Sequence, residues 1–288
     1  MDNSKRCLIA IDLDSTVLSS YFSLSADSVR ALIEAQTTGH VVMIATARPE
    51  AMTLPYHRAM GFHGPMSTLN GAHLYHPDDT EFPVYEELVS PESTAAFSDI
   101  ADRVGVKKIW LEQNRCVHAV SDPAPDFFYF REVFRQSGVT YHEKLPAVPA
   151  ARIYACADTE EQADAIMKVM SAREDCALRH HVTAAGEHRI NCNAVTADKW
   201  FAVKRAADYF GIPNENILTF GDEVNDRRMI LSAGHGFVLC NGNKSLQEEA
   251  LASGASVTEL SCAEGGVGNE IVVSISYSCT RYVSSPTM

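Results

Sequence analysis

The chain has 288 residues, 46% of them hydrophobic and 21% charged, which is typical of a globular protein and by length suggests about two domains. Its formal net charge of −13 argues against a nucleic-acid or anionic-membrane surface, because both would call for a basic patch. An anionic substrate is compatible with this charge if its binding site is locally positive.

The first predicted element is a buried strand that ends in two carboxylates. Residues 7–11 form a continuous apolar run, as expected of a strand covered on both faces of a parallel sheet. Asp12 and Asp14 follow it, and strand alternation places side chains two residues apart on one face. Because like charges repel at short range, the pair predicts a bound cation, and Mg²⁺ is a hard cation that prefers oxygen ligands.

Strand and helix alternate up to residue 82. The predicted elements are a helix over 25–38, a strand over 41–45, a helix that opens at 46–49 and ends near 61, and a strand over 66–69. Asn70 and Gly71 follow the last strand. This repetition predicts right-handed parallel crossovers, and hence an open α/β sheet whose ligands lie at the carboxyl ends of the strands.

Residues 83–193 show a different series, which we interpret as an inserted α+β module. The predicted elements are paired strands over 108–113 and 116–121, a helix over 126–136, a strand over 151–157, a helix over 159–172, and paired strands over 176–182 and 188–192. The strand pairs are joined by short turns, unlike the crossovers that precede them.

After residue 194 the first pattern resumes. The predicted elements are a helix over 198–210, a strand over 217–220, a further helix after the motif at 221–226, a strand over 236–239, a helix over 245–252 and a strand over 255–257. The serine-rich end, 274–288, is expected to be partly loose. The predicted fold is therefore α/β: a Rossmann-like parallel-sheet core of residues 1–82 and 194–288, with an α+β cap of residues 83–193 inserted in it.

The eight cysteines predict a reduced, cytoplasmic protein. They are spread over the chain without a C-x-x-C pair, and several lie in strand-like runs, as buried free thiols do. No apolar run approaches the roughly 18 residues of a membrane span. Asp12 and Asp14 also interrupt the N-terminal apolar run, which argues against a signal peptide. We expect no membrane or nucleic-acid partner, and either a monomer or a small homo-oligomer.

A second acidic motif, Gly221-Asp222-x-x-Asn225-Asp226, follows another predicted strand. Gly221 would permit a tight turn. Asp222 emerges at the end of its strand as Asp12 does, so that acidic groups from two strands could hold one Mg²⁺.

Three further residues suit an anionic ligand. Lys199 opens a predicted helix, and its ammonium could balance the carboxylates and meet a phosphate oxygen. Thr46 and Arg48 lie where a strand meets the next helix, and backbone N–H groups at such a helix start favour a bound anion. Together these groups predict a phosphoryl-transfer site, because that reaction asks mainly for positioning and charge stabilisation.

Each motif alone has a structural explanation. An Asp pair at a strand end can be a solvated turn, the second motif can cap a helix, Lys199 can be a surface lysine, and Thr46 can be a packed strand end. Their joint occurrence, each beside a predicted strand end or helix start, favours a single site.

These motifs resemble those of the haloacid dehalogenase (HAD) superfamily of phosphatases, and the Asn70-Gly71-Ala72 segment and cap-sized insert are similar to its Cof-type sugar-phosphatase branch. The resemblance implies Asp12 as nucleophile and Asp14 as general acid and base. It implies Mg²⁺ held by Asp12, the Asp14 carbonyl and Asp222. The phosphate- and substrate-binding residues that we predict are Thr46, Arg48, Asn70, Gly71, Lys199 and Asn225, with Asp226 supporting the metal and the lysine.

The sequence departs from the family pattern at three places. Ser15 stands where a glycine usually follows the second Asp, and Trp200 stands where a glycine usually follows the lysine. The late Met-x-Asn-Ala segment is replaced by Leu239-Cys240-Asn241-Gly242. These changes weaken an inference of the substrate from the family more than they weaken an inference of the reaction.

The predicted function is Mg²⁺-dependent hydrolysis of a small phosphomonoester, with a sugar phosphate as the first candidate, through an aspartyl-phosphate intermediate. A phosphomutase or phosphotransferase is the alternative enzyme, since the same Asp pair serves that chemistry. A non-catalytic ligand-binding protein with this fold is the third reading. Release of inorganic phosphate from a metabolite panel would distinguish the three.

Overall fold

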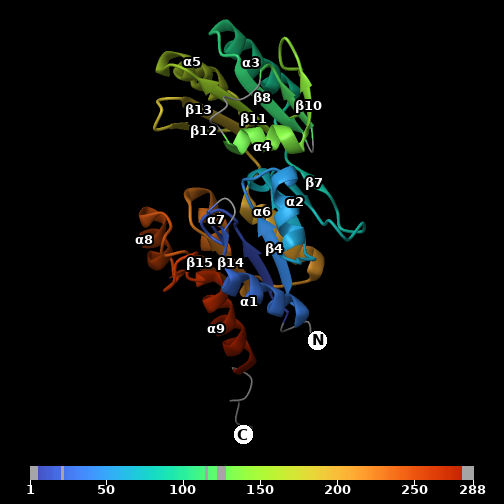
Figure 1. The fold of residues 1–288 in the computed structure, drawn as a ribbon, viewed down its shortest axis with the longest axis vertical. Helices are drawn as coiled ribbons and strands as arrows, with labels where there is room; N and C mark the ends of the chain where they lie inside the picture. The colour runs from blue at the N-terminus through green and yellow to red at the C-terminus, as the bar shows by residue number, and fades with distance from the viewer. Residues whose placement is uncertain (1–5, 21–22, 114–115, 122–127, 281–288) are drawn as a thin grey trace. The chain divides into compact units, whose positions relative to one another are not determined.

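The computed structural model describes residues 6–20, 23–113, 116–121 and 128–280. It divides into two compact units, whose elements are labelled in Figure 1. The first unit takes its described residues from 1–46, 56–84 and 199–288, and the second from 47–55 and 85–198. The segment 47–55, which the predicted boundaries assign to the core, thus clusters with the second unit.

The larger sheet is mostly parallel and has the strand order β16-β15-β14-β1-β4-β5-β6-β7. β6 runs antiparallel to β5, whereas the pairs from β16 to β5 are parallel. The strands are β1 (Leu8–Ile11), β4 (Val41–Ala45), β5 (Met66–Thr68), β6 (His73–Tyr75), β7 (Tyr85–Glu86), β14 (Ile217–Gly221), β15 (His235–Val238) and β16 (Ser256–Val257). A separate small sheet pairs β2 (Leu18–Ser20) with β3 (Ser23–Leu24).

β1 lies between two parallel neighbours, as its apolar sequence predicts. All four of its residues are buried, and Ile11 pairs with Phe220 of β14 on one side and Ile44 of β4 on the other. This register brings the carboxyl ends of β14, β1 and β4 to one edge of the sheet.

Helices cover this sheet. α1 packs against α9, whereas α6 packs against β4, β5 and α7. The helices outside residues 85–198 are α1 (Ala26–Thr37), α2 (Glu50–Ala59), α6 (Lys199–Phe210), α7 (Arg227–Ser232), α8 (Lys244–Ala252) and α9 (Gly266–Thr280). Ser25 caps α1 by accepting a hydrogen bond from the Ser28 N–H, and Gly39, with φ 97°, follows its C-terminal end.

The second unit is a six-stranded sheet with two hydrophobic clusters. Its order is β10-β9-β8-β11-β13-β12, antiparallel except for β9 and β10. Along β11, Ile153 packs into a cluster with Phe97 and Ile166, whereas Tyr154 packs with Trp110 in the other. The elements are α3 (Pro91–Arg103), β8 (Lys108–Gln113), β9 (Cys116–Ala119), α4 (Phe128–Gln136), β10 (Gly138–Tyr141), β11 (Arg152–Ala157), α5 (Glu160–Met170), β12 (Cys176–Val182) and β13 (His188–Ala194).

A buried ion pair accounts for part of the clustering of residues 47–55 with the second unit. Arg152 Nη2 donates to Glu112 Oε1 at 2.7 Å, with side-chain exposures of 4% and 1%. Arg152 Nη1 also donates to the Ala47 carbonyl at 3.2 Å, and Met52 packs into the Trp110 cluster.

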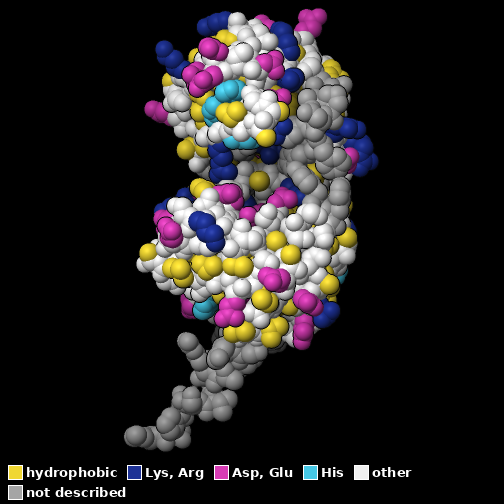
Figure 2. All heavy atoms as spheres, turned by 60° about the vertical axis from the view of Figure 1, so that its left-hand side comes forward, with side chains coloured by type: hydrophobic (Ala, Val, Ile, Leu, Met, Phe, Trp, Pro, Cys, Tyr) yellow, Lys and Arg dark blue, Asp and Glu magenta, His cyan; other side chains and the backbone are white. Residues whose placement is uncertain are grey.

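Histidines gather on the surface of the same unit, as Figure 2 shows. His180 Nε2 lies 3.1 Å from His188 Nδ1, across the antiparallel pair β12 and β13.

The structure corrects several predicted boundaries. The serine-rich end is not loose up to Thr280, because α9 continues to that residue; the remaining predicted segment, 281–288, lies outside the described residues. α2 begins at Glu50, so that Thr46 precedes the helix by several residues instead of opening it. α3 and β10 were not predicted. Among the described residues, no helix has the length and apolar character needed to cross a membrane.

Candidate active site

Three adjacent strands end in the predicted polar residues. Asp12 follows β1, Thr46 follows β4 and Asp222 follows β14, and β1 lies between the other two. The Asp12 N–H donates to the Phe220 carbonyl at 3.0 Å, which extends the strand pairing to the aspartate itself. The parallel sheet therefore brings Asp12, Thr46 and Asp222 to the edge where open α/β sheets bind their ligands.

Lys199 lies buried between two of the acidic residues. Its Nζ donates to Asp12 Oδ1 at 2.8 Å and to Asp226 Oδ1 at 2.6 Å. The exposed fractions of the Lys199, Asp12 and Asp226 side chains are 1%, 8% and 0%. Charges this deeply buried are tolerated because each has an opposite partner at hydrogen-bond distance.

The charges in this site shift one another's pKa values. Burial raises the pKa of Asp12 to about 8, against the opposing effect of Lys199. Burial, together with the charge of Asp226, raises the pKa of Asp222 to about 7. For Lys199, burial alone would lower the pKa, but Asp12 and Asp226 outweigh it and raise the pKa above its ordinary value. The lysine is thus held in its charged form.

Asp226 organises the loop after β14. Its Oδ2 accepts the backbone N–H groups of Asp222 at 3.0 Å and of Glu223 at 3.1 Å, while its Oδ1 binds Lys199. A Cβ on Gly221 would lie 2.5 Å from the Asp226 Cβ and Cγ atoms. Gly221 is therefore required for close approach of the Asp226 side chain, a reason that differs from the tight turn predicted from sequence.

The acidic cluster fits a divalent cation. Carboxylate oxygens of Asp12, Asp222 and Asp226 lie within 4.8 Å of one another. Three carboxylates and one ammonium leave two negative charges uncompensated, and burial disfavours them without a further cation. Because both Asp226 oxygens already bind Lys199 and backbone amides, Asp12 and Asp222 are the carboxylates best placed to bind a metal ion.

Asp14 does not share the position of Asp12 as strand alternation predicts. β1 ends at Ile11, and the chain then turns, with the N–H groups of Thr16, Val17 and Leu18 all donating to the Leu13 carbonyl. Asp14 is outside the three-carboxylate cluster, although its charge contributes to the raised pKa of Asp12. Asp14 is therefore near Asp12 without being one of the three clustered carboxylates.

The loop after β5 contributes Asn70 and Gly71. Asn70 has a left-handed φ of 61°, and its Oδ1 accepts a hydrogen bond from Asn225 Nδ2 at 3.0 Å. Its N–H donates to the Thr46 carbonyl at 3.0 Å. The structure thus joins the predicted residues Thr46, Asn70 and Asn225 directly, while Gly71 follows with φ 93°.

Arg48 belongs to the second compact unit, whereas Thr46, Asn70 and Asn225 belong to the first. It is buried, with 1% exposure, and belongs to the second unit, so that the first unit alone does not include it in the site.

Two polar residues of the site were missed from sequence. Thr16 Oγ1 donates to Asp222 Oδ1 at 3.2 Å, and it lies two residues after Asp14. Asn241 Nδ2 donates to the Ser15 carbonyl at 2.8 Å, and its Oδ1 accepts from the Cys262 N–H at 2.7 Å. Asn241 lies in the Leu239–Gly242 segment, which in sequence shows only a departure from the family pattern.

Comparison with known proteins identifies the family. The sequence matches the haloacid dehalogenase-like hydrolases over residues 9–271, and the chain belongs to that family. It is 27% identical over 249 residues to the 5-amino-6-(5-phospho-D-ribitylamino)uracil phosphatase YitU of Bacillus subtilis, covering 86% of this chain and 91% of that protein. Family and relatives together make the protein a phosphatase.

Solved structures show the same fold. A haloacid dehalogenase-like hydrolase from Bacteroides thetaiotaomicron aligns with a TM-score of 0.78 at 18% identity, covering 93% of this chain and 99% of that one. The HAD subclass IIB sugar phosphatase BT4131 aligns with a TM-score of 0.72 at 19% identity, over the same shares of the two chains. The predicted α/β fold is confirmed.

Proposed function

We propose that this phosphatase hydrolyses small phosphomonoesters with Mg²⁺ and that Asp12 is its nucleophile. The observation that supports this most strongly is the position of the Asp12 carboxylate, which lies at the end of a buried strand, bound by Lys199 and grouped with Asp222. A carboxylate held in this way is pre-oriented for attack on phosphorus.

Each of these residues has its own role in the proposed reaction. Asp12 attacks phosphorus and forms an aspartyl-phosphate as the bond to the leaving alcohol breaks. Asp14 gives that alcohol oxygen a proton and later takes one from the water that hydrolyses the intermediate. Lys199, and the Thr46 hydroxyl, bind phosphoryl oxygens, and Asp226 keeps the lysine in place. Asp12, the Asp14 carbonyl and Asp222 would hold Mg²⁺, whose charge would stabilise the phosphate oxygens.

Sugar phosphates are the first substrate class to test. YitU is named for a substrate with a 5-phospho-D-ribityl group, and BT4131 is named a sugar phosphatase. Both names describe a phosphate on a polyhydroxylated carbon chain. We infer that the predicted cap, residues 83–193, selects among such substrates.

Substitution of Asp12 tests the proposal. Asp12→Asn should lose phosphate release over a phosphomonoester panel with Mg²⁺, whereas Asp27→Asn should not, because Asp27 is an exposed residue of α1 paired with Arg30. Chelation of Mg²⁺ should abolish the wild-type activity. Full activity of Asp12→Asn would refute the nucleophile assignment. Transfer of phosphate within a sugar, dependent on a bisphosphate activator, would instead identify a phosphomutase, and binding without turnover would identify a non-catalytic protein.

A further inference from the structure

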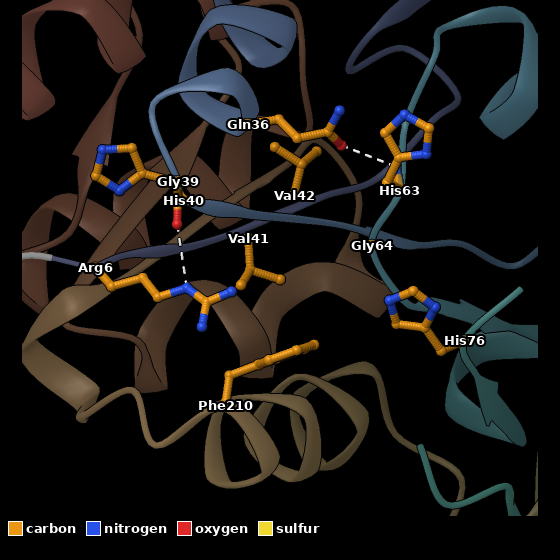
Figure 3. A pocket seen from close by; sticks show the side chains of 10 residues that line it. All are labelled: Arg6, Gln36, Gly39, His40, Val41, Val42, His63, Gly64, His76 and Phe210. Carbon is orange, nitrogen blue, oxygen red and sulfur yellow. Dashed lines mark hydrogen bonds between the residues drawn. The ribbon is translucent and has the colours of Figure 1, made fainter. Parts of the chain in front are cut away.

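The first unit contains a pocket that none of the proposed catalytic residues lines. It has a volume of about 260 Å³, and Figure 3 shows it at the start of β4. The residues that matter for its chemistry are Arg6, Gln36, His40, His63, His76 and Phe210. Asp12 and Thr46 follow the carboxyl ends of β1 and β4, whereas Arg6 and His40 precede the starts of these strands. The pocket and the acidic cluster therefore lie at opposite ends of the same strands.

Arg6 is a positioned cation in this pocket. Its Nε donates to the Gly39 carbonyl at 3.1 Å, and its Cζ lies 5.2 Å from the centre of the Phe210 ring. The remaining guanidinium nitrogens lie beside Val41 and Phe210 in Figure 3. Among the described residues, no carboxylate lies within ion-pair distance of Arg6. A guanidinium held by a carbonyl and an aromatic ring is suited to a bidentate carboxylate or phosphate.

Two imidazoles that line the pocket, those of His40 and His76, are neutral. His40 Nδ1 accepts the Cys7 N–H at 3.0 Å, and His76 Nδ1 accepts the Asp78 N–H at 3.2 Å, so that each neutral ring carries its proton on Nε2. Burial lowers the pKa of both histidines, which keeps them uncharged at neutral pH.

The third histidine adds little net charge. His63 is exposed, and its Nδ1 lies 3.6 Å from Asp78 Oδ2, so that any positive charge on the ring faces a carboxylate. Arg6 is therefore the main charge of the pocket, and the site matches a single negative charge.

The walls define the shape of the ligand. Phe210 and His76 are neighbouring rings, with centroids 6.4 Å apart, and Val41 and Val42 add apolar surface. Gln36 is fixed at both ends, because its Nε2 donates to the Gly61 carbonyl and its Oε1 accepts the His63 N–H. A cavity of about 150 Å³ holds benzene, so that 260 Å³ leaves room for one ring with a polar substituent.

We propose that this pocket is a second ligand site, which binds a small monoanion carrying a flat ring, such as an aromatic carboxylate. Arg6 binds the carboxylate, and Phe210 and His76 contact the ring. The site is independent of the phosphatase chemistry, and no step of the proposed reaction uses its residues.

Calorimetric titration of the full chain with benzoate tests this site. Benzamide is the neutral match, and cyclohexanecarboxylate is the anion without a flat ring. We expect saturable binding of benzoate, with at least tenfold weaker binding of both analogues. Arg6→Gln should weaken benzoate at least tenfold, whereas Arg30→Gln, at an exposed arginine of α1 paired with Asp27, should leave it unchanged.

Two further variants guard against loss of folding. Arg6→Lys keeps the charge but not the planar donor pair, and Phe210→Leu removes the ring; each should weaken benzoate while the unfolding temperature stays near that of the wild type. The proposal is overturned if no probe binds saturably, if benzamide binds as tightly as benzoate, or if the folded Arg6 variants bind benzoate as the wild type does. Activity of Asp12→Asn reports separately on the catalytic proposal.

Discussion

Replacement of Gly221 by alanine is the sharpest test of how the acidic site is assembled. The added Cβ would lie 2.5 Å from the Asp226 Cβ and Cγ atoms and 2.7 Å from Oδ2. Non-bonded carbon atoms normally stay about 3.5–4.0 Å apart, so that Asp226 would have to move by about 1 Å. Its hydrogen bonds to Lys199, at 2.6 Å, and to the N–H groups of Asp222 and Glu223 would then be stretched or lost.

The expected cost follows from these contacts. Overpacking costs about 1–3 kcal/mol, and a hydrogen bond to a charged group contributes about 1.5–3 kcal/mol. We therefore expect Gly221→Ala to lower the free energy of unfolding by on the order of 3 kcal/mol. In a domain of this size that corresponds to a fall in Tm of about 6–12 °C. Because Lys199 loses its anchor, phosphate release should fall at least ~100-fold.

Thermal unfolding followed by circular dichroism, and phosphate release with Mg²⁺, provide the two measurements. Gly254→Ala is the matched control: Gly254 has φ 84° and no heavy atom within 4 Å of an added Cβ, so that only backbone strain is introduced. That variant should lose about 1 kcal/mol and keep its activity. A Gly221→Ala protein with wild-type Tm and activity would refute the close-approach argument.

Three further predictions concern single residues. Ser15 has a left-handed φ of 53°, a backbone conformation that glycine adopts without strain. Ser15→Gly should therefore keep activity and change the free energy of unfolding by less than about 1 kcal/mol, because relief of strain offsets the greater chain entropy of glycine. A larger loss of stability in thermal unfolding would contradict this expectation. Glu112→Gln should destabilise the protein by about 3 kcal/mol in urea unfolding, since it removes the carboxylate charge that faces the buried Arg152 guanidinium, whereas Glu112→Leu with Arg152→Met should recover most of the loss. Equal destabilisation by both would show that the pair is not responsible. Burial lowers the pKa of His57 despite its hydrogen bond to the Gly64 carbonyl, so that the unfolded chain takes up a proton first as pH falls below about 6.5 and the folded protein loses stability. His57→Gln should flatten this loss of stability between about pH 7.5 and 5.5. An unchanged dependence of Tm on pH would exclude His57 as its source.

Secondary structure in the core was predictable because its signals are local. The apolar run of β1 is buried at all four positions, and α6 begins at Lys199 and ends at Phe210, within one residue of the prediction. α9 was missed because its serines resemble a loose tail, whereas packing against α1 stabilises the helix. The predicted start of the second helix, at residues 46–49, was too early, because α2 begins at Glu50, directly after Pro49. The sequence around Pro49 is compatible with several helix starts.

The sequence by itself determined which residues could bear the chemistry and on which strand ends they lie, because a buried strand followed by aspartate is a local pattern. Only the tertiary structure decided how these residues meet. Lys199 Nζ contacts Asp12 across 187 positions, and Asn225 contacts Asn70 across 155. The separation of Asp14 from the carboxylate cluster, and the need for glycine at Gly221, likewise follow from chain turns and close packing, which depend on atoms distant in sequence.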